Sequence, residues 1–326
     1  MFRMTSDILI GNFKSVKPNA AHWERSVDNF SDSATIKLPA IAMLKRLGDE
    51  YERVQTGQQF KEGMQVTINA GYDDVNDLRF RGFVRRINFT IPMELECEGY
   101  SYQLRKKLDF NKSYKNTTVR KILNDLIQGT NIKLSSKIPN IPLEKAVFQN
   151  CTGIQVLEWF KEKCLLTVYF NFDELYVGMQ QLEPKTTKRF RLGWNVIKDN
   201  ELKFNDQKEF AEVRIQMESR KKDGTKEKAF VGKKDGQVKK LKSVIKDKSV
   251  LTAIAQEQRN TILNQGYEGS ITAFLVPYVE QGMAAHIDDA KYPARTGKYF
   301  VTGVTGDFSN GGGRQKIYIG NTLGNG

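Results

Sequence analysis

The feature that most constrains this chain is a short segment that occurs twice, once near each end. The first copy is Gly63-Met64-Gln65-Val66-Thr67-Ile68, and the second is Gly282-Met283-Ala284-Ala285-His286-Ile287. An apolar run broken by one glycine follows each copy. So large a separation excludes a solenoid repeat. We therefore expect one small β domain to occur twice, marked by Gly63, Met64, Ile68, Gly82, Gly282, Met283, Ile287 and Gly303.

Length and composition limit the class of protein. The 326 residues allow two or three domains, and 39% hydrophobic residues are enough for packed cores. No apolar stretch approaches the roughly 18 residues of a transmembrane helix, and the N-terminus lacks the apolar region of a signal peptide. Three cysteines without CxxC spacing indicate reduced thiols. We expect a protein made in a cytoplasm, with no membrane span.

Residues 1–100 show the pattern of a β-barrel domain. Met64 to Ala70 alternates apolar and polar side chains, as a half-buried strand does. Leu78 to Phe89 predicts a long strand in which Gly82 allows a bulge or a bend. Five or six short strands at this spacing are typical of a barrel or a sandwich.

The pattern changes after residue 100. Apolar residues from Val119 to Ile127 fall on one face of an amphipathic helix, which Thr117 or Thr118 can cap. Thr152 begins a second helix with the form of a capping box. Two strands follow, at 166–170 and 175–177. Residues 101–185 therefore predict a small α+β domain.

The last part of the chain returns to strand patterns. Residues 186–203 have the character of a connector, and alternation resumes at Val213. One helix, with Leu251 and Ile254 on its apolar face, interrupts the strands. We expect a second barrel over 186–320 and a frayed tail over 321–326. The fold class is then α+β, mostly β, with two similar β-barrel domains flanking the small α+β domain.

The positive charge is concentrated in the second of these barrels. The net charge is +13, and residues 214–248 contain thirteen Lys or Arg against five Asp or Glu. Two Asp-Gly pairs predict hairpin turns here. The hairpins are either solvated or contact an acidic partner. Single-stranded nucleic acid would need interleaved aromatics, and Phe230 is the one available. The candidate contact residues are Arg220, Lys221, Lys222, Lys226, Lys228, Lys233, Lys234, Lys239 and Lys240.

The sequence contains no motif typical of catalysis or of metal binding. The two histidines, His22 and His286, lie in strand patterns without Cys, Asp or Glu at metal-ligand spacing. Gly311-Gly312-Gly313 precedes a strand rather than a helix, so it is not a phosphate-binding loop. We expect no enzymatic activity, no cofactor and no metal.

The order of motifs along the chain resembles that of a known protein family. In sequence they are Ser31 to Pro39, the Gly63 strand with its Gly71-Tyr72 turn, Phe80-x-Gly82-x-Val84, Glu96 to Tyr100, Leu175 to Gly178, Gly266 to Thr272 and Gly313 to Gly320. In this order the chain resembles the baseplate hub proteins of contractile phage tails, the late control protein D class. It is also similar to the N-terminal hub part of type VI secretion spike proteins.

The resemblance implies a structural hub of a phage tail baseplate or a related contractile injection machine. It implies two tube-like β-barrels per chain and a homotrimer, whose pseudo-sixfold ring joins the tail tube protein to the central spike. Because the chain ends at Gly326 without the spike domains of its relatives, we expect a separate spike protein and other baseplate proteins as partners. The implied location is the host cytoplasm during assembly and then the virion tail.

Two alternative functions remain open at this point. One is a basic nucleic-acid-binding module, which should lose affinity steeply with salt. The other is a cell-wall hydrolase of a tail tip, which should turn over peptidoglycan.

Overall fold

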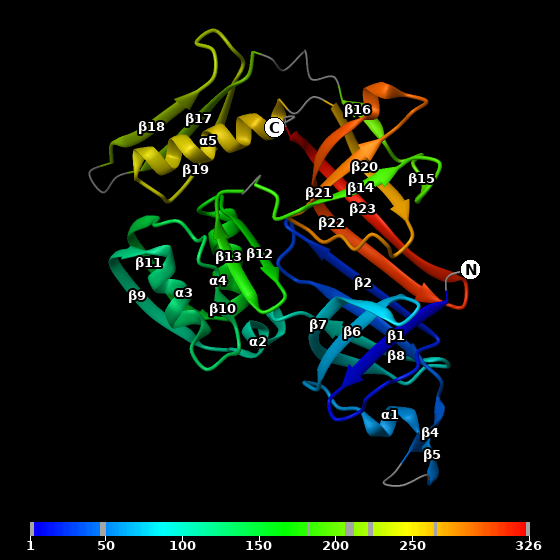
Figure 1. The fold of residues 1–326 in the computed structure, drawn as a ribbon. Coiled ribbons are helices and arrows are strands. Elements are labelled where there is room, and N and C mark those ends of the chain that lie inside the picture. The colour runs from blue at the N-terminus through cyan, green and yellow to red at the C-terminus, as the bar shows by residue number, and fades with distance from the viewer. Residues whose placement is uncertain are drawn as a thin grey trace.

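The computed structural model describes residues 3–45, 50–180, 183–205, 212–220, 224–263 and 266–323. Strands dominate over helices, so the α+β, mostly β class is confirmed. Figure 1 shows the blue N-terminal strands beside the red C-terminal strands, with the green and yellow middle of the chain packed to one side.

Among the described residues, thirteen strands join in one sheet, and twelve of them form two sets that we call the first and second modules. The first module contains β1 (Met4–Ile10), β2 (Ala20–Ser26), β3 (Ser33–Leu38), β6 (Gln65–Tyr72), β7 (Val75–Asn88) and β8 (Met93–Glu98). The second contains β14 (Thr187–Arg191), β15 (Val196–Lys198), β20 (Gly266–Ala273), β21 (Ala284–Asp288), β22 (Gly297–Ser309) and β23 (Gly312–Leu323). The thirteenth strand is β16 (Lys203–Asn205).

The two modules have the same strand order. The order is β1-β6-β7-β8-β3-β2 in the first module and β14-β21-β22-β23-β20-β15 in the second. If the strands of each module are numbered along the chain, both orders read 1-4-5-6-3-2. They differ at the first pair, because β1 is antiparallel to β6 whereas β14 is parallel to β21. The two ends of the chain therefore share one strand order, and they differ only in the direction of the first strand.

The repeated Gly-Met segments adopt the same turn before β6 and β21. Gly63 and Gly282 have φ angles of 85° and 82°, a region that favours glycine. In both copies the glycine N–H donates to a valine carbonyl, and the N–H of that valine donates to the methionine carbonyl. The N···O distances are 2.8 Å with Val84 and 2.9 Å with Val301.

The second glycine of each copy does not correspond as we expected. The strand register makes Phe83 the equivalent of Phe300. Gly82 therefore precedes the shared position, whereas Gly303 follows it. A Cβ at Gly82 would lie 2.2 Å from the carbonyl oxygen of Glu98, so this glycine allows close approach to β8. Gly303 instead lies beside β2. Similar local composition made two unlike positions look alike.

Two expectations for the second module are wrong. Residues 186–203 are not a connector, because β14 pairs with β21 and β15 pairs with β20. These strands have three to five residues, too few for alternation to be recognised. In addition, β23 continues to Leu323, where Thr322 pairs with Tyr299. Residues 321–323 of the expected frayed tail are thus in a strand, and residues 324–326 lie outside the described ranges.

The remaining elements of the first part and middle are short. A hairpin, β4 (Ile41–Lys45) and β5 (Tyr51–Gln55), and α1 (Thr56–Gln59) extend from the first module. The middle region contains α2 (Ser101–Lys106), β9 (Phe110–Thr118), α3 (Val119–Ile127), β10 (Lys133–Leu134), β11 (Pro142–Cys151), α4 (Gly153–Glu162), β12 (Thr167–Asn171) and β13 (Glu174–Gly178). Both predicted helix starts are confirmed. The hydroxyl of Thr118 accepts from the N–H of Lys121, and Thr152 forms a complete capping box with Gln155.

The basic segment forms a three-stranded sheet that we call the basic sheet. Its strands are β17 (Arg214–Arg220), β18 (Lys226–Val231) and β19 (Val238–Lys242). Since β18 is antiparallel and β19 parallel to the central β17, the expected pair of hairpins is one hairpin plus a returning strand. The helix α5 (Lys248–Ile262) covers one face of this sheet. We expected it to belong to the second module, but it shares a hydrophobic core with the middle region. A short turn of helix, Pro293–Arg295, precedes β22.

Candidate functional site

The two modules meet along a pair of strands. β2 runs antiparallel to β22 from the Ala20–Ser309 pair to the Ser26–Gly303 pair, and its other edge pairs with β3. One continuous sheet therefore crosses from module to module. A Cβ at Gly306 would lie 2.1 Å from the ring of buried Trp23. The absence of a side chain at Gly306 thus allows the indole to pack on β22.

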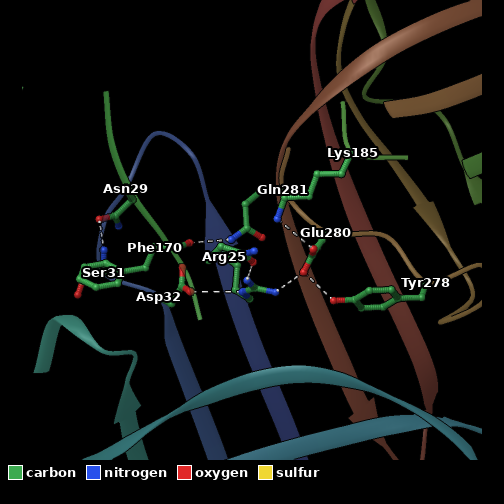
Figure 2. A network of polar contacts seen from close by, with 10 residues as sticks. Arg25, Asn29, Ser31, Asp32, Phe170, Lys185, Tyr278, Glu280 and Gln281 are labelled. Carbon is green, nitrogen blue, oxygen red and sulfur yellow. Dashed lines mark hydrogen bonds and ion pairs between the residues drawn. The ribbon is translucent and has the colours of Figure 1, made fainter. Parts of the chain in front are cut away.

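A buried arginine lies at the centre of this junction. Arg25, on β2, is 3% exposed, and its Nε donates to Asp32 Oδ2 at 3.3 Å. Its Nη1 donates to Glu280 Oε2 at 3.2 Å, and its Nη2 donates to Asn171 Oδ1 at 3.1 Å. The ring of Phe172 lies 3.7 Å from the guanidinium carbon. Figure 2 shows the two carboxylates on opposite sides of the guanidinium. One side chain thus connects both modules and the middle region.

The same network holds the segment that precedes the repeated turn of the second module. The hydroxyl of Tyr278 donates to Glu280 Oε2 at 2.8 Å, and Gln281 Nε2 donates to the carbonyl of Phe170 at 3.1 Å. Lys185 Nζ lies 3.9 Å from the other carboxylate oxygen of Glu280 (Figure 2). These contacts end directly before Gly282, so the junction network positions that turn.

Burial and charge pairing oppose each other in this network. Burial raises the pKa of Asp32 to about 6, although Arg25 opposes the shift, and Asp32 Oδ1 has no hydrogen-bond partner among the described residues. Burial lowers the pKa of Arg25, but the carboxylates of Asp32 and Glu280 outweigh it and raise that pKa overall. The guanidinium therefore stays charged. A buried charge with partners on both sides resists separation of those partners.

A second set of buried contacts crosses the junction. Arg79 on β7 is 2% exposed, and it donates to the carbonyls of Ala70 at 3.0 Å and Leu275 at 2.7 Å. The hydroxyl of Tyr72 donates to the carbonyl of Gly313 at 2.9 Å. Separation of the modules would break the bonds to Leu275 and Gly313 and leave their buried polar groups unsatisfied. The two modules are therefore fixed relative to one another.

Within the described ranges, each module also has a strand edge without a partner. In the second module, β2 covers the edge of β22 from Gly303 to Ser309. The equivalent stretch of β7 begins at Arg86. There β8 pairs with one side, and no described strand pairs with the other. Phe89 and Ile91, just beyond, are 76% and 90% exposed. Open edges with exposed apolar residues favour pairing with another chain.

The complementary open edge belongs to the second module. β15 and β16 run along β20 in the way that β2 runs along β3. Where β2 has β22 on its other side, β15 and β16 have no strand in the described ranges, apart from an isolated bridge at Val196. Ile197 and Phe204 are exposed here. Among the described residues, both halves of a β2–β22 type of contact are therefore present without a partner.

The basic sheet gathers part of the predicted cationic set. Ile215 and Met217 are buried in the core shared with α5, so alternation places the residues between them on the opposite side. We call this uncovered side the basic face. By register it contains Arg214, Gln216, Glu218, Arg220, Lys226, Lys228, Phe230, Val238, Lys240 and Lys242.

Three of the predicted cationic residues are not on the basic face, and two are outside the described residues. Lys239 pairs with Ile215 on the other side of the sheet. Lys233 and Lys234 lie in the loop before β19, where Lys233 Nζ is 3.3 Å from Glu212 Oε1. Lys221 and Lys222 lie outside the described residues.

Other chemistry is sparse in the part of the chain that the structure describes. No group of three or more His, Cys, Asp or Glu residues there could hold a metal ion. Burial raises the pKa of the Cys97 and Cys164 thiols, which makes their reactive thiolates rare. No helix within the described ranges is long and apolar enough to cross a membrane.

The junction network was not predicted, although the sequence contains one signal of it. Arg25 follows Ala21 and Trp23 on the same side of an alternating strand, so the pattern places a charge on the buried face. A buried guanidinium needs hydrogen-bond acceptors, and carboxylates among them balance its charge. Their identity was not accessible, because Glu280 is 255 residues away along the chain.

Comparisons with known proteins place the fold. No family model and no curated protein matches the sequence. A solved structure of a tail protein from Neisseria meningitidis MC58 matches with a TM-score of 0.67 at 14% identity, over 98% of this chain and 97% of that chain. The 43 kDa tail protein of prophage MuSo2 from Shewanella oneidensis gives 0.62 at 14% identity, over 96% and 97%.

A third similar solved structure is a protein of a bacterial secretion system. It is an Escherichia coli component of the type VI secretion system, described as similar to bacteriophage T4 tail proteins. It matches with a TM-score of 0.59 at 10% identity, over 98% of this chain and 77% of that chain. The chain therefore has the fold of phage tail proteins and of a type VI secretion component, which confirms the resemblance at the level of fold.

Proposed function

We propose that this chain is the structural hub of a phage tail baseplate or of a related contractile injection machine. Three copies form a pseudo-sixfold ring that joins the tail tube to the central spike. The observation that carries the proposal is the strand order shared by two modules within one continuous sheet. Two alike modules per chain let three chains present six similar units. The tail-protein folds among the solved structures support this role.

The junction inside the chain supplies a template for the contact between chains. In the ring, β15 and β16 of one copy take the place of β2, and β7 of the next copy takes the place of β22. The exposed Ile197 and Phe204 then face the stretch that contains Phe89 and Ile91. This contact uses two different surfaces, so it can repeat around a closed ring. It also covers the open strand edges.

The template fixes a register. Inside the chain, Glu24 of β2 pairs with Thr305 of β22. Glu24 also pairs with Ser33 of β3, a place that Lys203 takes beside β20. Thr305 is as far beyond Phe300 as Asn88 is beyond Phe83. The proposed ring therefore places Lys203 of one copy opposite Asn88 of the next.

The remaining parts of the proposal concern partners and location. A pseudo-sixfold ring of three chains can contact a sixfold tube protein on one side and a threefold spike protein on the other. Other baseplate proteins then surround it, as in the late control protein D class. We propose that the chain assembles in the host cytoplasm and becomes part of the virion tail. Its role is structural rather than enzymatic.

The experiment is a disulfide cross-link between chains. We combine Asn88→Cys with Lys203→Cys in a Cys151→Ser background, because Cys97 and Cys164 are buried. Disulfides require Cα atoms within about 7 Å, which directly opposed strand residues satisfy. On oxidation, the double variant should give species of two and three chains, and each single variant should not. A double variant that stays monomeric, or single variants that cross-link equally well, would contradict the proposed contact.

A further inference from the structure

The basic face carries more positive charge than its own residues neutralise. Of its ten described residues, six are cationic and Glu218 alone is acidic. Lys226 Nζ lies 3.3 Å from Glu218 Oε2, and this contact holds the pKa of Glu218 below its usual range. The carboxylate thus stays ionised and balances one cation. Five positive charges remain on a face of three short strands.

Apolar side chains accompany these charges. Phe230 and Val238 are each 44% exposed, on the two strands that flank β17. The guanidinium carbon of Arg214 lies 4.5 Å from the centroid of the Phe230 ring. Val238 pairs with Arg214 in the register, so the apolar residues lie on either side of one arginine. Apolar contact area bordered by charges is the usual composition of a protein interface.

The aromatic content of the face indicates the chemistry of the partner. Four of the six cations are lysines and two are arginines, and both kinds pair with carboxylates as well as with phosphates. Nucleic acid strands also need aromatic side chains on which successive bases stack. Phe230 is the one aromatic residue among the ten of the face. Carboxylates next to an apolar residue fit this surface better than phosphates and bases.

We propose that the basic face is a docking surface for an acidic segment of a partner protein, in which Asp and Glu side chains surround an apolar residue. Charge complementarity carries the proposal. The surface is separate from the proposed ring contact, because the basic sheet does not join the sheet that contains both modules. Failure of the ring would therefore leave this inference in place, and the reverse also holds.

The experiment measures binding of a labelled peptide of alternating glutamate and leucine to the full chain. Binding of a single-stranded oligothymidylate of the same length is measured for comparison, because it represents a nucleic-acid partner. The salt concentration is about 0.15 M, where distant charges are screened. The test variant carries Lys228→Gln, Lys240→Gln and Lys242→Gln. The matched control carries Lys233→Gln, Lys234→Gln and Lys239→Gln, which remove the same charge from outside the face.

We expect the test variant to lose affinity for the peptide about tenfold, and the control less than about threefold, given typical strengths of surface ion pairs. Phe230→Ser should weaken binding of the leucine-containing peptide but not of an all-glutamate peptide. Equal losses in the two triple variants would overturn the proposal, because net charge alone would then explain binding. Tighter binding of oligothymidylate than of the peptide, or no peptide binding by the unaltered chain, would also overturn it.

Discussion

The buried carboxyl of Asp32 makes the stability of the module junction depend on pH. Burial raises the pKa of Asp32 from 3.8 to about 6, and Arg25 does not fully compensate. The native protein therefore holds this proton more tightly than the unfolded chain does. As the pH rises from about 4 to about 6, the unfolded state ionises first, so the free energy of unfolding falls. A difference of about two pKa units corresponds to about 3 kcal/mol.

The substitution Asp32→Asn isolates this contribution. Asparagine keeps an oxygen that can accept from Arg25 Nε, but it does not titrate. We expect urea unfolding to show that, from pH 4 to pH 7, the free energy of unfolding of the unaltered protein falls by about 2.5 kcal/mol more than that of the variant. Asp235→Asn, which removes an exposed carboxylate from a turn, is the matched control and should follow the unaltered protein.

Two results would refute this reasoning. Parallel pH profiles for Asp32→Asn and the unaltered protein would show that the carboxyl does not change its pKa on folding. If the unaltered protein instead gained stability relative to the variant as the pH rose, attraction to Arg25 would outweigh burial. The pKa of Asp32 would then lie below its ordinary value.

Three further substitutions test the junction and the middle region by chemical or thermal unfolding. Arg25→Met leaves the carboxylates of Asp32 and Glu280 without their buried cation and should lower the free energy of unfolding by about 3–5 kcal/mol. The control Lys185→Met, which removes a 3.9 Å contact, should lower it by less than about 1 kcal/mol. Equal losses in the two variants would contradict the network. Gly306→Ala forces a Cβ against Trp23 and should cost about 1–3 kcal/mol, while Gly311→Ala, whose nearest neighbour would be 3.5 Å away, should be close to neutral. Thr152→Ala removes the capping box of α4 and should cost about 1 kcal/mol; no change would mean that the cap contributes little to stability.

Local signals in the sequence were sufficient for several elements. The caps at Thr118 and Thr152 depend on residues three positions apart, so a single chain displays them fully. The alternation from Met64 to Ala70 likewise predicted β6, because one face of that strand is buried. The repeated Gly-Met turn was visible because both copies need a positive φ at the glycine.

Long-range features were not accessible in the same way. β14, β15 and β16 are strands because partners far along the chain hold them, and their own residues show little alternation. The parallel return of β19 to β17 depends on the core beneath α5, whereas the Asp235-Gly236 pair suggested a simple hairpin. The network around Arg25 joins residues from three parts of the chain, so no local pattern predicts it.

The central claim is that two similar modules in each chain let three chains form a ring with pseudo-sixfold symmetry. Cryo-electron microscopy of the assembled chain tests it most directly. We expect closed rings of three chains, about 112 kDa from a chain mass of 37.3 kDa, with six similar lobes and β7 of each copy beside β16 of its neighbour. Closed assemblies of two or four chains, or three-chain rings whose two modules occupy unlike positions, would contradict it.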